Sequence, residues 1–260
     1  MEQIKKYNIL KIDGGNKNIV EDIVVLEYPF TIFVDGKEVI TLLCSPRSLK
    51  YLAVGFLYSE GFIEGYSAIE DVQIDEIKGR AYIRLNAKGI FNKKLQEKRT
   101  IASSGAKGTM FYDMLDSLKS KKVKEPLNIP VYEIKKLMET FNKNSELFYK
   151  TGGVHACAIC NNNNIIYFEE DIGRHNALDK VLGRALAEDM DLKDKIVLLS
   201  GRVSSEMLVK AVKREIKVVV SRSAPTSLAV HMARELNIAL IGFVRGEKMN
   251  IYSSFSSLKF

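Results

Sequence analysis

The chain has 260 residues, of which 46% are hydrophobic and 27% are charged. These fractions are typical of a globular protein with an ample core, they exclude a disordered chain, and no apolar run approaches the roughly 20 residues that span a bilayer. The formal net charge of +7 favours anionic partners without distinguishing nucleic acid, phosphorylated cofactor and acidic protein, and a merely soluble basic surface is an equal alternative.

The cell compartment follows from the first residues and from the thiols. Residues 1–11 lack the apolar core of a secretory signal. Three cysteines are an odd number in a chain this long, which argues against a disulfide framework and agrees with a reducing compartment. We therefore expect a cytoplasmic protein.

The first half of the chain predicts a mainly β region with one helix inserted. The Asp35-Gly36 pair between two β-rich runs is a hairpin signal. Ser45-Pro46 offers a helix N-cap followed by proline at the first helical position. In chain order we expect strands at 24–34 and 38–44, a helix from Pro46 to the stop at Gly61, and strands at 72–77 and 81–85.

A stretch of small residues at 100–109, with two glycines, precedes another predicted helix. Such a stretch could cradle an anion, although an ordinary flexible loop is the commoner explanation. The basic run 119–124 contains no aromatic residues for base stacking, so we interpret it as a solvated linker and expect no nucleic-acid partner. The predicted division is a β-rich region at 1–125 and an α/β domain at 126–260.

From Pro130 onward, strands and helices alternate. An apolar run with His155 turns at four asparagines, returns as a second run, and feeds a helix that begins near Arg174. Alternation of this kind predicts a largely parallel sheet with helices on its faces. We expect further strands at 196–199, 218–220 and 238–243, an edge strand at 250–252, and helices at 134–141, 177–186 and 228–236.

Cys157, Cys160 and His155 invite a zinc interpretation because C-x-x-C is a common metal-ligand spacing. Residues three apart in a strand point to opposite faces, however, so two strand thiols could not converge on one ion. We predict no metal site and expect both thiols to be small buried hydrophobes.

Polar and cationic residues recur at the junctions between strands and helices. Arg174 with His175, Arg202 and Arg222 each follow a predicted strand, so an open α/β sheet would gather them at the carboxyl ends of its strands. This pattern predicts a crevice for a phosphate-bearing ligand, with both His155 and His175 as neutral hydrogen-bond donors or as structural residues. The sequence contains neither a dinucleotide fingerprint nor a P-loop, and no nucleophile elbow supports a hydrolase.

Several long segments resemble the FdhD formate dehydrogenase accessory proteins. They are SPRSLKYLAVGFLYSEG at 45–61, TGGVHA at 151–156, EDIGRHNALDK at 170–180, SGRVSSEM at 200–207, SAPTSLA at 223–229 and GFVRGEKMNIY at 242–252. The resemblance implies a cytidine-deaminase-like, three-layer α/β domain behind an N-terminal mainly β region, and a homodimer. It also implies sulfur transfer from a cysteine desulfurase to the molybdenum bis(guanine dinucleotide) cofactor, before that cofactor enters formate dehydrogenase.

The resemblance also implies which residues of this chain bind the cofactor. Arg245 and Lys248 suit phosphate contacts, Gly246 suits close backbone approach, and Phe243 either stacks on guanine or finishes a buried strand. A GDP-like nucleotide would fit the same positions. The expected cofactor-binding residues are Phe243, Val244, Arg245, Gly246, Glu247, Lys248, Gly153, His155, Arg174, His175 and Arg202.

One departure from the family concerns the loop that carries the persulfide cysteines. An ungapped match to that loop places Ser104 and Lys107 at the two catalytic positions, in a loop at 103–108 that we expect to act as a lid. Neither side chain can hold a persulfide, because sulfur transfer proceeds through a thiolate. Two functions stay open: a sulfur-transferring accessory protein that serves formate dehydrogenase, and a non-catalytic scaffold that binds a guanine nucleotide or the cofactor. Neither involves a membrane.

Overall fold

The computed structural model describes residues 1–86, 118–125, 127–254 and 258–259. The loop at 103–108, with Ser104 and Lys107, and the helix predicted after it lie outside the described residues. None of the described helices is long and apolar enough to cross a membrane.

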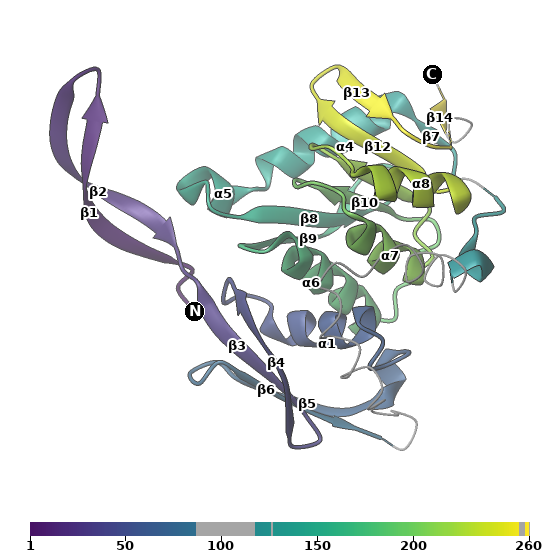
Figure 1. Cartoon of the computed structure of the whole chain (residues 1–260), viewed down its shortest axis with the longest axis horizontal. Coiled ribbons are helices and arrows are strands. Elements are labelled where there is room, and N and C mark those ends of the chain that lie inside the picture. The colour runs from purple at the N-terminus through teal and green to yellow at the C-terminus, as the bar shows by residue number, and fades with distance from the viewer. Residues whose placement is uncertain (87–117, 126, 255–257, 260) are drawn as a thin grey trace.

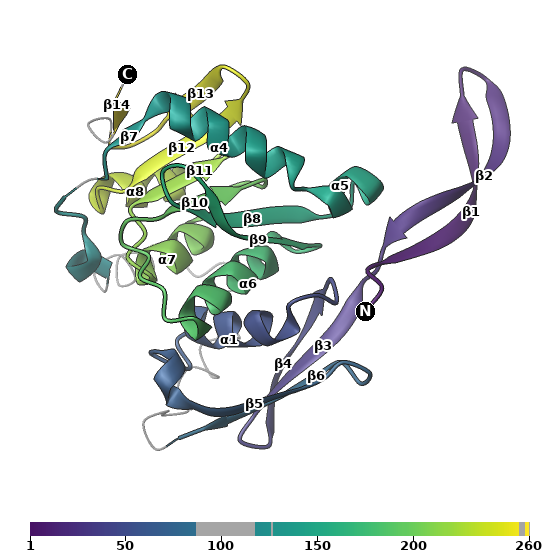
Figure 2. The same cartoon turned by 180° about the vertical axis from the view of Figure 1, so that it is seen from behind.

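The chain begins with a long β-hairpin that extends away from the rest of the protein (Figures 1 and 2). Strand β1 (Ile4–Asp13) pairs antiparallel with β2 (Asn16–Val25) over ten residues. The strand predicted at 24–34 is confirmed from Tyr28 to Val34, but its predicted start was wrong, because Val24 and Val25 end β2. The hairpin escaped prediction because its apolar residues lie on both faces and give no clean alternation.

A four-stranded sheet follows, in the order β4-β3-β6-β5. The Asp35-Gly36 hairpin is confirmed, and both residues have positive φ, 48° and 77°, as a tight hairpin turn requires. Helix α1 (Leu49–Ser59) and the short helix η1 (Tyr66–Ala68) are packed with this sheet around one apolar core. The strands are β3 (Tyr28–Val34), β4 (Lys37–Cys44), β5 (Ile69–Asp75) and β6 (Arg80–Leu85).

Helix α1 begins three residues later than predicted, after Ser48, because Ser45 does not cap the helix but forms hydrogen bonds with the second half of the chain. The Ser45 backbone N–H donates to Asp171 Oδ2 at 3.1 Å, and its hydroxyl donates to the Glu170 carbonyl at the same distance. Lys180 completes the cluster: its Nζ lies 2.7 Å from Asp171 Oδ2, and neither side chain is accessible to solvent. This buried ion pair ties the start of the first helix to the second half of the chain.

The two halves also meet where α1 crosses α6 (Arg174–Ala187). A Cβ atom added to Gly55 would lie 1.9 Å from the Asp179 carbonyl oxygen. One added to Gly183 would lie 2.0 Å from the Tyr51 carbonyl oxygen. The two helices are therefore in backbone contact, and only glycine fits at the crossing.

The larger sheet has six strands in the order β13-β12-β11-β10-β8-β9. Among the described strands of this sheet only the β10–β11 and β11–β12 pairs are parallel, so the predicted largely parallel sheet was wrong and the sheet is mixed. The antiparallel pairs arise from two hairpins, one of them at the asparagine turn, and from β8 next to β10. The strands are β8 (His155–Cys160), β9 (Ile165–Asp171), β10 (Ile196–Leu199), β11 (Val218–Ser221), β12 (Ala239–Arg245) and β13 (Lys248–Ile251).

Helices cover both faces of this sheet and enclose two cores (Figures 1 and 2). Cys157 belongs to the core under α6 to α8 and Cys160 to the core under α4, as strand alternation predicts. The remaining elements are α4 (Val131–Lys143), α5 (Glu146–Thr151), α7 (Ser205–Lys213), α8 (Ser227–Glu235), η2 (Lys119–Lys121), β7 (Ile129–Pro130) and β14 (Leu258–Lys259). The domain boundary between residues 125 and 126 stays a prediction.

Candidate functional site

A cleft of about 490 Å³ opens where three central strands end. Ser200 follows β10, Arg222 follows β11 and Arg245 ends β12. Strand β8 runs antiparallel to β10, so its first residue, His155, reaches the same edge of the sheet. The lining residues are Phe148, Gly152, Gly153, Val154, His155, Ser200, Arg222, Ser223 and Arg245.

Arg174 lies beside this cleft with an unused donor. A Cβ atom on Gly201 would lie 3.0 Å from His155 Nδ1 and 3.6 Å from Arg174 Cβ, so the glycine lets these two residues lie close together. The Nε atom of Arg174 is buried and has no hydrogen-bond partner among the described residues. A buried donor without a partner is costly, and an anionic ligand would remove that cost.

A β-bulge in β12 sets the direction of Phe243 and Arg245. Phe243 has a φ of 54° and is 38% exposed, so the alternative in which it finishes a buried strand was wrong. Arg245 Nε donates to the Arg222 carbonyl at 3.2 Å, and its guanidinium lies 6.0 Å from the Phe243 ring centroid. The Arg245 Nη groups, which make no hydrogen bond to a described residue, are available to a ligand in the cleft.

The remaining predicted cofactor residues lie outside the lining. His175 Nε2 lies 3.2 Å from Glu206 Oε2 on α7, and Arg202 is exposed in the loop after β10. Val244 is buried in the core, so only its backbone can reach a ligand. Gly246, Glu247 and Lys248 form the turn into β13, where Glu247 pairs with Lys135.

Five lining residues were not predicted from the sequence: Phe148, Gly152, Val154, Ser200 and Ser223. Ser200 and Ser223 sit at the same strand ends as the predicted arginines, so the junction rule could have found them. The Ser200 hydroxyl accepts from the Ala156 N–H at 2.9 Å and the Ser223 N–H donates to Ser221 Oγ, also at 2.9 Å. Gly152 ends α5 in the left-handed conformation, with a φ of 64°.

The start of α6 is the most open of the three helix N-termini near this edge. Ser204 caps α7 and Thr226 caps α8, because each hydroxyl accepts a backbone N–H of the first turn at 3.3 Å. Gly173, the N-cap residue of α6, has no side chain that could accept an N–H of the first turn, and Asp171 Oδ1 accepts the N–H of Gly173 itself at 2.9 Å. The free N–H groups of α6 can therefore attract an anion near Arg174.

Both histidines are held neutral. Burial lowers the pKa of His155, and Arg174 lowers it further against the opposing effect of Asp171. Burial also lowers the pKa of His175, with further lowering by Lys210 and Arg174. Each imidazole therefore donates from one nitrogen and accepts at the other near neutral pH.

Acidification should destabilise the protein through these histidines. Because each folded-state pKa lies below the ordinary value of 6.5, the unfolded chain binds more protons. Their contribution to stability is full above that value and is lost as the pH falls through the folded-state pKa. We expect the midpoint temperature of thermal unfolding to fall as the pH is lowered below 6.5. The fall should be less steep in a His155→Gln, His175→Gln double variant. Parallel midpoint curves for the two proteins would show that the histidines make no such contribution.

The chain's three cysteines are all buried. Burial raises the pKa of Cys44 to about 12 and that of Cys160 to about 12, and it raises the pKa of Cys157 well above its ordinary value. All three are therefore thiols rather than nucleophilic thiolates at neutral pH. The described residues contain no group of three His, Cys, Asp or Glu side chains that could hold a metal ion.

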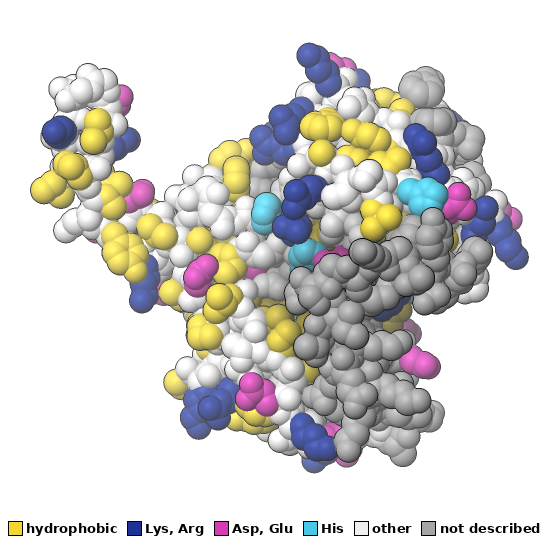
Figure 3. Space-filling model, viewed as in Figure 1, with side chains coloured by type: hydrophobic (Ala, Val, Ile, Leu, Met, Phe, Trp, Pro, Cys, Tyr) yellow, Lys and Arg dark blue, Asp and Glu magenta, His cyan; other side chains and the backbone are white. Residues whose placement is uncertain are grey.

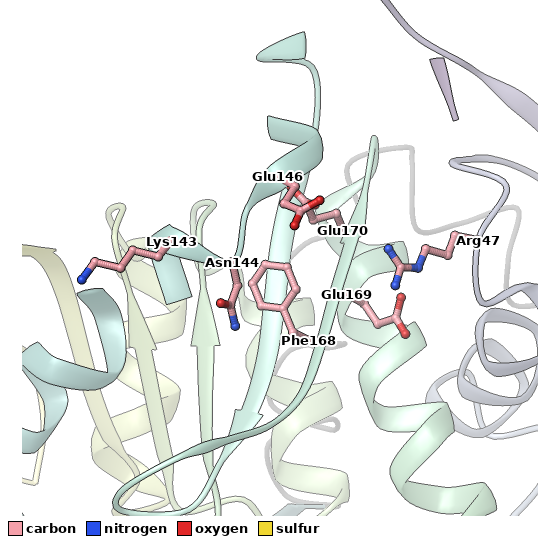
Figure 4. Close-up of a pocket in the computed structure, with 7 residues that line it drawn as sticks. All are labelled: Arg47, Lys143, Asn144, Glu146, Phe168, Glu169 and Glu170. Carbon is pink, nitrogen blue, oxygen red and sulfur yellow. The ribbon is translucent and has the colours of Figure 1, made fainter. Parts of the chain in front are cut away.

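A second hollow, of about 360 Å³, does not suit an anion. Figure 4 shows the carboxylates of Glu146, Glu169 and Glu170 around it, with Arg47 and Lys143 on opposite sides. Burial raises the pKa of Glu170, but its carboxylate already accepts the backbone N–H groups of the first turn of α5. The three carboxylates outnumber the two cationic side chains, so this hollow would repel a polyanion. The cleft beside Arg174 is the better candidate for an anionic ligand.

The chain is similar to the proteins of one known family along most of its length. Residues 25–259 match the FdhD/NarQ family. The chain is 43% identical to the sulfur carrier protein FdhD of Listeria innocua over 260 residues, covering 99% of this chain and all of that one. It is 40% identical to the Bacillus subtilis protein of the same name, over 95% of this chain and 94% of that one.

A solved structure shares the fold over almost the whole chain. It is the crystal structure of a proposed formate dehydrogenase accessory protein from Desulfotalea psychrophila. The two structures have a TM-score of 0.80 at 24% identity, covering 99% of this chain and all of the other. With the family match over 25–259 and full-length relatives above 40% identity, this chain belongs to the FdhD/NarQ family.

Proposed function

We propose that the cleft binds the guanine dinucleotide part of the molybdenum bis(guanine dinucleotide) cofactor, and that the protein serves formate dehydrogenase as an accessory protein. The observation that carries the proposal is the meeting of Arg222, Arg245 and His155 in one cleft beside the uncapped start of α6. The name of the relatives, sulfur carrier protein, supports the same family of functions. We infer that the larger domain is cytidine-deaminase-like and that the protein works in the cytoplasm.

The chemistry of the lining fits a pyrophosphate. Arg222 and Arg245 supply positive charge, and an arginine can bind two phosphate oxygens at once. Gly152 presents backbone without a side chain, and a Cβ atom there would meet nothing within 4 Å, so a ligand can approach closely. The exposed ring of Phe243 next to Arg245 offers a stacking surface for a guanine base.

We propose that the protein's part in maturation is to bind and present the cofactor. Sulfur transfer requires a thiolate, and all three cysteines of the chain are buried with raised pKa values. Ser104 and Lys107, at the family's catalytic positions, offer no sulfur atom. A relay through this chain would therefore need a cysteine that the fold keeps away from solvent.

Incubation with a cysteine desulfurase and cysteine should leave Cys44, Cys157 and Cys160 without added sulfur in intact-mass spectra. A small thiol-alkylating reagent should likewise spare the three cysteines in the folded protein and modify them after unfolding in urea, since burial is the cause of protection. A stoichiometric persulfide on one of the three in the folded protein, passed on to the cofactor, would restore the sulfurtransferase assignment.

A cell that lacks its own accessory protein tests the function as a whole. Expression of this chain should restore formate dehydrogenase activity, and the Arg245→Ala variant should restore much less. A specific result favours the scaffold alternative: guanine nucleotide binding by the purified protein together with no restored activity.

A further inference from the structure

Ser221, the last residue of β11, has a buried hydroxyl that joins two strand ends beside the cleft. Its side chain is 0% exposed, and Ser221 is not among the residues that line the cleft. Ser221 Oγ donates to the Gly201 carbonyl at 2.8 Å and accepts the Ser223 N–H at 2.9 Å. One hydroxyl group therefore connects the segment after β10 to the segment after β11.

The loop that begins at Arg222 sets the position of both cleft arginines. Its first N–H, that of Arg222, donates to the Leu199 carbonyl of β10 at 2.9 Å. On the other side, the Ser223 carbonyl accepts the Phe243 N–H of β12 at 3.1 Å, and the Arg222 carbonyl accepts from Arg245 Nε at 3.2 Å. The loop is therefore bonded to the strands on both sides, and Arg245 depends on where Arg222 lies.

Gly201 connects the same hydroxyl to the opposite wall of the cleft. A Cβ atom on Gly201 would lie 3.0 Å from His155 Nδ1, so there is little room between this backbone and the imidazole. The preceding residue, Ser200, lines the cleft. A shift of the Gly201 segment would therefore move one wall of the cleft relative to the arginines on the other.

Removal of the Ser221 hydroxyl would disturb this arrangement from the interior. The Gly201 carbonyl would lose a donor and the Ser223 N–H would lose its acceptor, and buried polar groups without partners are costly. Figure 3 shows Lys and Arg side chains next to His side chains on the surface over the larger sheet, where a ligand can reach them. Ser221 has no such exposed surface, so it can influence a ligand only through other residues.

We propose that Ser221 is a positioning residue of the cleft. Its hydroxyl holds the segments after β10 and β11 together, and thereby keeps Arg222 and Arg245 in the arrangement that binds a nucleotide diphosphate. The identity of the ligand rests on the proposed function of the cleft, whereas the ordering of the two arginine segments is a property of the protein without ligand.

Ser253 provides a matched control at the other end of β12. It is 1% exposed, and its hydroxyl donates to the Ile238 carbonyl at 2.6 Å and accepts the Leu240 N–H at 3.1 Å. Ser221→Ala and Ser253→Ala each remove one buried hydroxyl that donates once and accepts once. We expect similar decreases in the midpoint temperature of thermal unfolding, with an effect on the cleft in Ser221→Ala alone.

Calorimetric titration with GDP at low salt measures the effect on the cleft. Ser221→Ala should raise the Kd about ten-fold, while Ser253→Ala should bind GDP like the unaltered protein. In an Arg222→Ala background, Ser221→Ala should raise the Kd by a smaller factor, because the hydroxyl acts partly through the side chain already removed. Equal Kd values for the two serine variants would overturn the proposal, and so would an undiminished factor in the Arg222→Ala background.

Amide hydrogen exchange without nucleotide separates this inference from the proposed function. The N–H groups of Arg222 and Phe243 should exchange several-fold faster in Ser221→Ala than in Ser253→Ala, which corrects for a loss of overall stability. If the unaltered protein bound no GDP and these rates still rose, the proposed ligand would be wrong and the positioning role would stand. Equal exchange rates in the two serine variants would overturn the positioning role even if GDP bound to the cleft.

Discussion

Replacing Lys180 by methionine should lower the free energy of unfolding by about 3–5 kcal/mol, the usual cost of leaving one member of a buried ion pair alone. Lys180 and Asp171 are both inaccessible to solvent, with Nζ and Oδ2 2.7 Å apart. Lys180 Nζ also donates to the Ser45 carbonyl at 3.0 Å. Methionine fills similar space but provides no donor, so Asp171 would keep its charge in the interior without its cation. Urea denaturation followed by circular dichroism measures the change.

Arg84→Met provides a matched control, because Arg84 pairs with Glu70 at 3.2 Å on the surface and both side chains are more than half exposed. Exposed pairs contribute little to stability, so this variant should unfold close to the unaltered protein. If Lys180→Met unfolded at the same urea concentration as Arg84→Met, the buried cluster would not hold the two halves together.

Alanine at Arg222 or Arg245 should weaken GDP binding by about 1.5–3 kcal/mol, which is roughly a 10- to 150-fold rise in Kd. Each change removes a charge-assisted contact to phosphate in a cleft where the two arginines are already in contact through the 3.2 Å bond from Arg245 Nε. Because they are neighbours, the effects in the double variant should not add. Isothermal titration at low salt gives the Kd values.

Arg202→Ala is the matched control for these variants, since Arg202 follows a strand like Arg222 but is exposed outside the cleft. We expect its GDP affinity to stay near that of the unaltered protein. Equal losses in Arg202→Ala and Arg222→Ala would show that overall positive charge, rather than the cleft, attracts the nucleotide.

The parts of the fold that the sequence predicted are those with local signals. Three local patterns each predict one element, and the structure contains each of those elements: Asp35-Gly36, the asparagine turn and the apolar run at 196–199. The direction of β8 against β10 and the backbone contact at Gly55 depend on residues far apart in the chain. No local pattern encodes them, so the mixed sheet and the crossing of α1 over α6 emerged only from the structure.

The candidate site divides in the same way. Arg222 could be placed at this edge by the rule that strand ends gather in an open sheet, whereas Arg245 came from the family resemblance and His155 from its place in the TGGVHA segment. Two features of the site could not be predicted from the sequence and emerged only from the structure: the bulge that exposes Phe243, and the burial of Arg174 Nε. Arg202 shows the limit of the junction rule, since it follows its strand by three residues where Arg222 follows by one, and it is exposed outside the cleft lining.

The cleft should bind a guanine nucleotide diphosphate, and a calorimetric titration of the unaltered protein with GDP at low salt measures this directly. We predict saturable binding of one GDP per chain, weakened by added salt, with guanosine binding far more weakly because it has no phosphate. The absence of any saturable heat with GDP under these conditions would contradict the account.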